Sequence, residues 1–167
     1  LLNNNMIKEA KAYLSNQIDF IVILATPMLI SLILFNNIII NFIYSEDFVP
    51  ANELIRFSAV GMYFMAIKQP FDLVPYAFGD KKTFLGITFV GTLSLLVSTI
   101  LGYYLDGLRG IGISFVFHSL FSLVFILIIC KRKYNLYLRI SNQVIVSKGS
   151  LAVAISLFVV SYESYLI

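Results

Sequence analysis

Five long apolar runs, each with few or no charged residues, constrain the fold of this chain more than any other feature of its sequence. A run of about 20 apolar residues crosses the hydrocarbon core of a bilayer as an α-helix, because only a helix or a closed barrel satisfies the backbone polar groups there. The runs therefore predict an all-α, polytopic bundle of transmembrane helices with four full spans and a truncated fifth. The predicted spans are 18–43, 51–77, 83–105, 108–130 and 149–167. Asn36 and Asn37 predict that the buried part of the first span ends near Phe35.

The composition indicates the same class. Hydrophobic residues make up 59% of the chain and charged residues 13%, and the mean hydropathy is +0.90. A soluble domain is about half apolar and about a quarter charged. The single cysteine, Cys130, excludes a disulfide framework within the chain. Because the chain closes in the middle of an apolar run, we expect it to be part of a longer, transporter-sized protein, whose remainder holds half of any functional site.

Basic and basic-poor segments alternate between the predicted spans. Bases occur in the N-terminal flank, in the loop 78–82 and in the segment 131–148, whereas 44–53 carries three acids and no base. Positive charge marks the cytoplasmic side of a membrane protein. We therefore expect the N-terminal flank and the loops 78–82 and 131–148 to be cytoplasmic, and the acidic loop to lie outside.

Lys68 and Asp72 are charged residues inside the second predicted span. Lys68 lies about 14 Å from the inner end of this span, and Asp72 follows one turn later on the same face. Two interpretations are open: a self-satisfied ion pair at a helix contact, or a cationic site in a water-filled cavity that holds an anionic head group. Pro70 and Pro75 flank the pair and predict a break in the helix.

Arg56, His118 and Asp19 are three further ionisable residues within the predicted spans. Arg56 lies near the outer end of its span, where it either reaches lipid phosphates or faces a cavity that opens outward. His118 is either hydrogen-bonded to a neighbour or titrates in ion coupling. Asp19 is expected to mark the start of the first helix.

Small residues recur at four-residue spacing in two neighbouring spans. The third has Ser94, Ser98 and Gly102, and the fourth has Gly110, Ser114 and Ser122 in line with His118. Such ridges allow close approach of membrane helices, so we expect them to serve packing.

Three segments carry a resemblance to a known family: "FIYSEDFVPANELIRF" (42–57), "FGDKK" (78–82) and "GLRGIGISFVFHSL" (107–120). Together they resemble the O-antigen and polysaccharide (Wzx-type) flippases of the multidrug/oligosaccharidyl-lipid/polysaccharide exporter superfamily. The resemblance covers roughly residues 18–134 and places these helices in the C-terminal half of such a transporter.

The resemblance implies a flippase of the bacterial inner membrane. It would translocate undecaprenyl-pyrophosphate-linked oligosaccharide, a repeat unit of O-antigen, capsule or a related surface glycan, by alternating access. Lys68 fits the cationic cavity residue that holds the head group and Arg56 comes second, with Asp72 and His118 completing the candidate substrate-binding set. The implied partners are the lipid-linked substrate, the bilayer and other polysaccharide assembly proteins.

Other function classes stay open. A multidrug and toxin extrusion antiporter would favour acids over Lys68 in its cavity, and a membrane polysaccharide polymerase would need a large extracytoplasmic loop. A non-transporting scaffold would use Lys68 and Asp72 only as a pair. The sequence has no metal-ligand spacing, phosphate loop or nucleophile motif, so we expect no enzymatic chemistry, no cofactor, no metal and no nucleic-acid partner.

Overall fold

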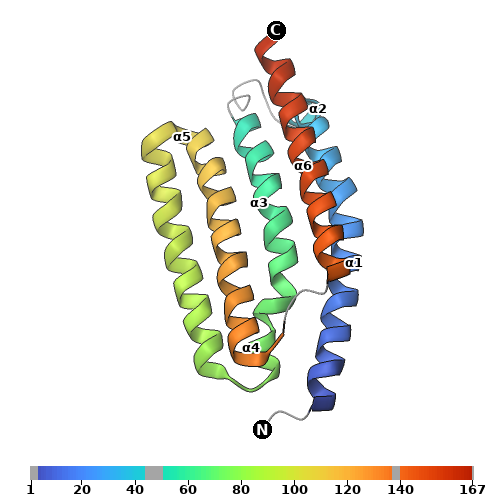
Figure 1. Ribbon diagram of the computed structural model, residues 1–167. Coiled ribbons are helices and arrows are strands. Elements are labelled where there is room, and N and C mark those ends of the chain that lie inside the picture. Colours follow the sequence, from blue (N-terminus) through green and yellow to red (C-terminus); the bar gives the residue numbers. More distant parts are fainter. Residues whose placement is uncertain (1–3, 44–50, 137–139, 167) are drawn as a thin grey trace.

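The computed structural model describes residues 4–43, 51–136 and 140–166, and within these ranges every regular element is an α-helix (Figure 1). The helices are α1 (Asn4–Leu34), α2 (Asn36–Ile43), α3 (Ala51–Asp72), α4 (Val74–Ala77), α5 (Lys81–Tyr134) and α6 (Ile140–Leu166). The predicted all-α class is therefore confirmed for the described part of the chain.

Segments of three helices are long and apolar enough to cross a membrane. They are Lys8–Leu34 in α1, Lys81–Tyr134 in α5 and Asn142–Val160 in α6. The 22-residue α3 is not among them, and it carries four charged side chains, Glu53, Arg56, Lys68 and Asp72. The structure is thus compatible with a membrane-embedded protein.

Helix α5 is a hairpin of two antiparallel arms. The backbone leaves helical geometry at Asp106 and Gly107, and Figure 1 shows the ribbon turning back on itself there. Gly107 has φ 55°, a conformation that side chains with a Cβ rarely adopt. The first arm (81–105) and the second arm (108–134) correspond to the spans predicted at 83–105 and 108–130.

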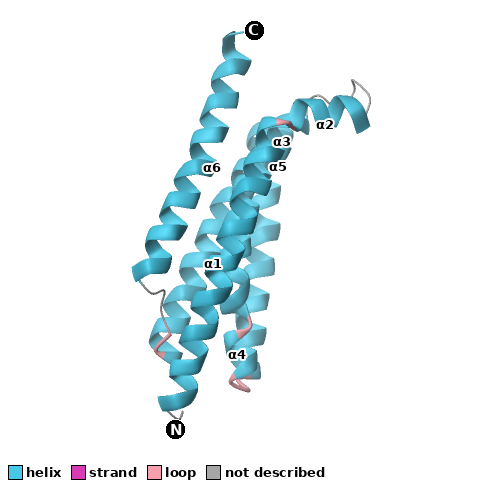
Figure 2. Ribbon diagram, turned by 90° about the vertical axis from the view of Figure 1, so that its right-hand side faces the viewer, coloured by secondary structure: helices cyan, strands magenta, loops and turns pink. Residues whose placement is uncertain are grey.

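The first predicted span, 18–43, is two helices with different directions. Helix α1 ends at Leu34, and α2 turns away from it at Asn36 (Figure 2). The Asn36 side chain donates from Nδ2 to the carbonyl oxygen of Asn52 at 2.8 Å, which fixes the bend against α3. Helix α1 thus ends next to Phe35, and the end of the membrane-buried part at this position stays a prediction. Asp19 does not start the helix, because α1 begins at Asn4 and already includes the polar flank.

The second predicted span, 51–77, breaks where the prolines predict. Helix α3 ends at Asp72, and α4 begins at Val74 with Pro75 in its first turn. Proline has no backbone N–H, so Pro75 leaves the carbonyl of Phe71 without its usual helical partner. The thiol of Cys130 in the second arm donates to that carbonyl oxygen at 3.8 Å.

The last predicted loop, 131–148, is largely helical, so its predicted extent is wrong. Helix α5 continues to Tyr134 because basic residues stabilise a helix C-terminus, and Asn135 ends it in the left-handed conformation (φ 54°). Helix α6 begins at Ile140, nine residues before the predicted start at Gly149. Gly149 lies inside α6, where a Cβ would collide with Tyr63.

The connections between the helices lie at two opposite ends of the bundle. The start of α1, α4 and the link between α4 and α5 lie together at one end, and the turn of α5 and α2 lie at the other (Figure 1). The basic segments 8–11, 78–82 and 131–133 therefore share one end, as their alternation predicts. The acids of the loop 44–50 and Arg139 lie outside the described residues.

Asp80 joins the two arms of α5 at this basic end. Its carboxylate caps the first arm by accepting from the backbone N–H of Thr83 at 3.2 Å. It also accepts from the Tyr134 hydroxyl at 2.7 Å and pairs with Lys133 at 2.5 Å. The hydrogen bonds from Lys133 first, and then from Tyr134 and Thr83, hold the pKa of Asp80 well below its usual range.

Helix α3 is the centre of the bundle. It packs on α5 along one side and on α1 along another, and α6 packs on α1. Ala59, Tyr63, Ile67 and Phe71 recur at four-residue spacing on α3 and are at most 1% exposed, which defines its buried face. Lys68 and Asp72 lie on a different face, which is turned toward α5.

Candidate functional site

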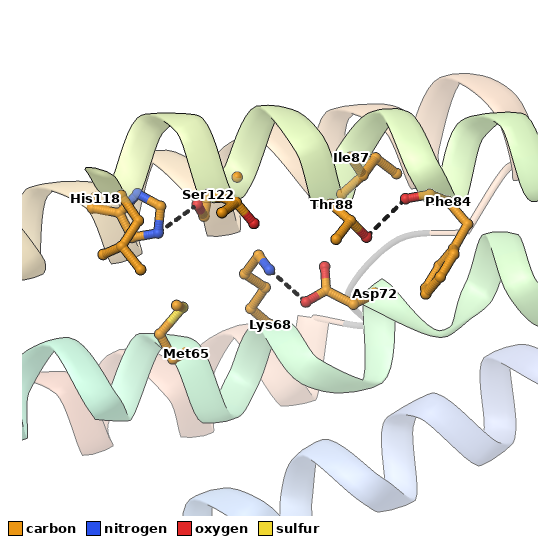
Figure 3. Close-up of a pocket in the computed structure, with 11 residues that line it drawn as sticks. Met65, Lys68, Asp72, Phe84, Ile87, Thr88, His118 and Ser122 are labelled. Carbon is orange, nitrogen blue, oxygen red and sulfur yellow. Dashed lines mark hydrogen bonds and ion pairs between the residues drawn. The ribbon is translucent and has the colours of Figure 1, made fainter. Parts of the chain in front are cut away.

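A cavity of about 310 Å³ lies between α3 and the two arms of α5. Three of the four predicted substrate-binding residues, Lys68, Asp72 and His118, line it (Figure 3). The remaining lining residues are Met65 from α3, Phe84, Ile87, Thr88, Gly91, Thr92 and Leu95 from the first arm, and Ser122 from the second arm. The fold thus brings together side chains from α3 and from both arms of α5.

Lys68 and Asp72 form an ion pair inside this cavity. The Lys68 ammonium contacts Oδ2 of Asp72, with the two side chains 15% and 30% exposed. The other carboxylate oxygen, Oδ1, is buried and accepts no hydrogen bond in the described part of the chain. The two interpretations from the sequence therefore do not exclude each other, since the pair exists and it also lines a cavity.

The cavity extends deep along the bundle. Thr92 of the first arm faces the same cavity and is about a dozen residues from the capping Asp80, so the cavity extends to roughly 18 Å from the basic end at 1.5 Å per residue. A charged group at such a depth in a bilayer is costly unless it is paired or hydrated.

His118 closes the cavity at the seam between the two arms. Its Nδ1 lies 3.2 Å from the Ser94 hydroxyl of the first arm, and its Nε2 lies 3.4 Å from the Ser122 hydroxyl. His118 is 4% exposed. These two contacts confirm the prediction that it is hydrogen-bonded to a neighbour. A role in ion coupling stays a prediction.

The small-residue ridges pack against each other along this seam, as expected. Gly102 and Gly110 approach so closely that a Cβ on either would collide with the other's carbonyl group. Gly112 of the second arm likewise meets the backbone of Leu54, and Gly61 of α3 meets Phe115. These contacts fix the position of His118 relative to Lys68.

The hydroxyl groups of the first arm in the cavity, on Thr88 and Thr92, were not identified from the sequence. Thr88 donates from Oγ1 to the carbonyl of Phe84 at 2.9 Å, so its own oxygen can still accept a hydrogen bond. Phe84, Thr88 and Thr92 are spaced four residues apart, which places them on one helix face. That spacing is the signal that could have identified them.

Arg56 lies apart from the cavity. It is 6% exposed and donates from Nη2 to Oδ1 of Asn37 at 2.9 Å, which ties α3 to the start of α2. Its Nε is buried without a hydrogen-bond partner among the described residues. The structure thus gives Arg56 a contact with α2, and its role in substrate binding stays a prediction.

Asn142 is a buried polar residue that the sequence did not single out. It is fully buried and its Nδ2 donates to the backbone carbonyl of Ser15 at 3.1 Å and to Oδ1 of Asp19 at 2.7 Å. Its Oδ1 accepts from the Ser15 hydroxyl at 2.8 Å. This network explains Asp19, whose carboxylate serves the contact of α1 with α6.

The chemistry of the cavity suits a small charged group. The ammonium of Lys68 and the hydroxyls of Thr92 and Ser122 can donate to an anion, and the carboxylate of Asp72 can accept from a cation. Within residues 4–43, 51–136 and 140–166, no group of three or more His, Cys, Asp or Glu side chains is placed to hold a metal ion.

The chain matches no family model, no curated protein and no solved structure.

Proposed function

We propose that the protein is a flippase for a polyprenyl-pyrophosphate-linked oligosaccharide, and that Lys68 binds the anionic head group of this lipid. The observation that carries the proposal is the cavity between α3 and the two arms of α5, which an ammonium group, hydroxyl groups and an imidazole line together. The resemblance of the segments 42–57, 78–82 and 107–120 to the O-antigen and polysaccharide flippases supports the substrate class.

The proposed topology has five spans. They are α1, α3, the two arms of α5 and α6, in the inner membrane of a bacterium. The basic end, with the N-terminal flank, the loop 78–82 and the segment 131–148, faces the cytoplasm by the positive-inside rule. α3 is included as a span because its charged residues are paired or hydrogen-bonded within the bundle.

The break between α3 and α4 supports a role in alternating access. The pair of Lys68 and Asp72 is located at the C-terminal end of α3, directly before the break at Leu73. Broken helices place substrate sites at membrane depth in many transporters, because the break lines a cavity rather than lipid. A movement of α4 against α3 would therefore change the surroundings of Lys68.

Translocation in proteoliposomes tests this proposal. The complete protein is reconstituted, and the flipping of a fluorescent prenyl-pyrophosphoryl oligosaccharide is measured for the wild type, Lys68→Ala and Lys68→Arg. We expect Lys68→Ala to abolish flipping at normal protein levels, and Lys68→Arg to retain part of it because the charge is kept. Normal flipping by Lys68→Ala would overturn the assignment of Lys68.

A second candidate function is favoured by Asp72. A carboxylate in the same cavity suits an organic cation, as in a multidrug and toxin extrusion antiporter. The same proteoliposomes distinguish the two, since uptake of tetraphenylphosphonium that depends on Asp72, without flipping of the lipid, would favour the cation exporter.

A further inference from the structure

The carboxylate of Asp72 already occupies the position at which an anion would meet Lys68. The ammonium group contacts Oδ2 of Asp72, and the pair lies on the cavity face of α3. Because the pair is neutral, the cavity offers no net positive charge while it is intact. An anion that binds Lys68 must therefore compete with Asp72.

Asp72 is poorly placed to stay ionised once Lys68 leaves it. It is the last residue of α3, and the carbonyl groups at a helix C-terminus disfavour a negative charge. Its Oδ1 is buried without a hydrogen-bond donor in the described part of the chain. An unpaired buried carboxylate beside an incoming anion is strongly unfavourable, and protonation removes that cost.

The other titratable groups around Asp72 do not take over the role of Lys68. Lys68 is on the same helix, and the second arm contributes His118 to the cavity and the thiol of Cys130 next to Phe71. The first arm presents Phe84, Ile87 and Thr88, which do not titrate. His118 already contacts two hydroxyl groups.

We propose that Asp72 is an internal competitor for the substrate anion, and that its displacement from Lys68 is coupled to the uptake of one proton. This proposal rests on the proposed function, since it assumes an anionic ligand at Lys68. In the exchange, the hydrogen bond from Lys68 to Oδ2 of Asp72 breaks, and a new one forms from Lys68 to a phosphate oxygen. One proton passes from water to the Asp72 carboxylate, so the cavity residues change from a net charge of zero to one positive charge.

Binding calorimetry on the complete protein in lipid nanodiscs tests the coupling. The probe is a farnesyl-pyrophosphoryl-N-acetylglucosamine, whose two phosphates stay ionised across the measured range, so the probe itself takes up no proton. Titrations at about pH 6 to about pH 8, in buffers with different ionisation enthalpies, give the affinity and the number of protons taken up. The variants are Asp72→Asn, Asp72→Glu, Lys68→Ala and His118→Asn.

The expected result is an affinity for the wild type that falls about tenfold per pH unit, with one proton taken up. Asp72→Asn should bind more tightly and lose both the pH dependence and the proton uptake, while Asp72→Glu and His118→Asn should keep them. If the wild type binds and Lys68→Ala does not, but Asp72→Asn keeps the proton uptake, the competitor role is overturned and the proposed function stands. If neither the wild type nor Asp72→Asn binds the probe, the proposed function is itself overturned.

Discussion

Replacing Asn142 by Leu is expected to weaken the contact of α1 with α6 more than any other single polar substitution there. Asn142 makes three hydrogen bonds to Ser15 and Asp19, and its side chain is fully buried. A hydrogen bond contributes about 1 kcal/mol and one to a charged group about 2 kcal/mol, although membrane helices show smaller values of about 0.6 kcal/mol each. The expected loss of folding free energy is therefore about 2 to 4 kcal/mol.

Equilibrium unfolding of the complete protein in mixed micelles measures this loss. The control is Asn16→Leu, which changes the same residue type on α1 at an exposed position and should leave the unfolding free energy within about 0.5 kcal/mol of the wild type. Equal stability of the Asn142→Leu variant and the wild type would show that these hydrogen bonds do not hold α1 against α6, as would an equal loss in the control.

Three further predictions concern the packing of α5, the contact of α3 with α2, and the basic end. Gly110→Ala should lower stability by about 1 to 3 kcal/mol, because the new Cβ meets the backbone of the first arm. The control Gly86→Ala has open space and should be neutral or gain up to about 1 kcal/mol. Equal thermal stability of the two variants would contradict this. Arg56→Ala should increase hydrogen exchange in α2 because its hydrogen bond is lost, while Arg109→Ala, whose ion pairs are exposed, should not; no change in α2 would count against the contact. Asp80 has a folded pKa below its unfolded value, so its contribution to stability is present above about pH 4 and is lost only as the pH falls through the lower folded pKa. Hydrogen exchange at residues 78–83 should therefore rise only in strong acid in the wild type, and at every pH in Asp80→Asn. Fast exchange of these residues in the wild type near neutral pH would refute the cap.

The helical architecture could be predicted because the bilayer allows few alternatives. The two arms of α5 follow from the apolar runs at 83–105 and 108–130. The break at Leu73 follows from the local effect of the prolines at 70 and 75. The start of α6 was missed for a physical reason. Residues 140–148 are too polar to read as a span, yet they are helical because Asn142 finds its partners on α1.

The candidate site could be predicted only in part. The pairing of Lys68 with Asp72 is a local effect of four-residue spacing, which the sequence shows directly. The proximity of His118 depends on how the hairpin of α5 packs on α3, and this contact joins residues 50 positions apart (118 against 68) in the sequence. The position of Arg56 depends on the direction in which α2 leaves α1, and no local pattern specifies that direction.

Solid-state NMR on the complete protein in lipid bilayers tests whether Lys68 binds the head group, because it detects a phosphate next to a particular lysine. With lysine labelled by ¹⁵N at Nζ and the farnesyl-pyrophosphoryl-N-acetylglucosamine probe bound, the ³¹P–¹⁵N dipolar coupling reports an ammonium group hydrogen-bonded to phosphate, at about 4 Å. One such coupling is expected in the wild type and none in Lys68→Arg, which keeps the charge but removes the labelled atom. A coupling that persists unchanged in Lys68→Arg, or its absence in a wild type that binds the probe, would contradict the placement of the head group at Lys68.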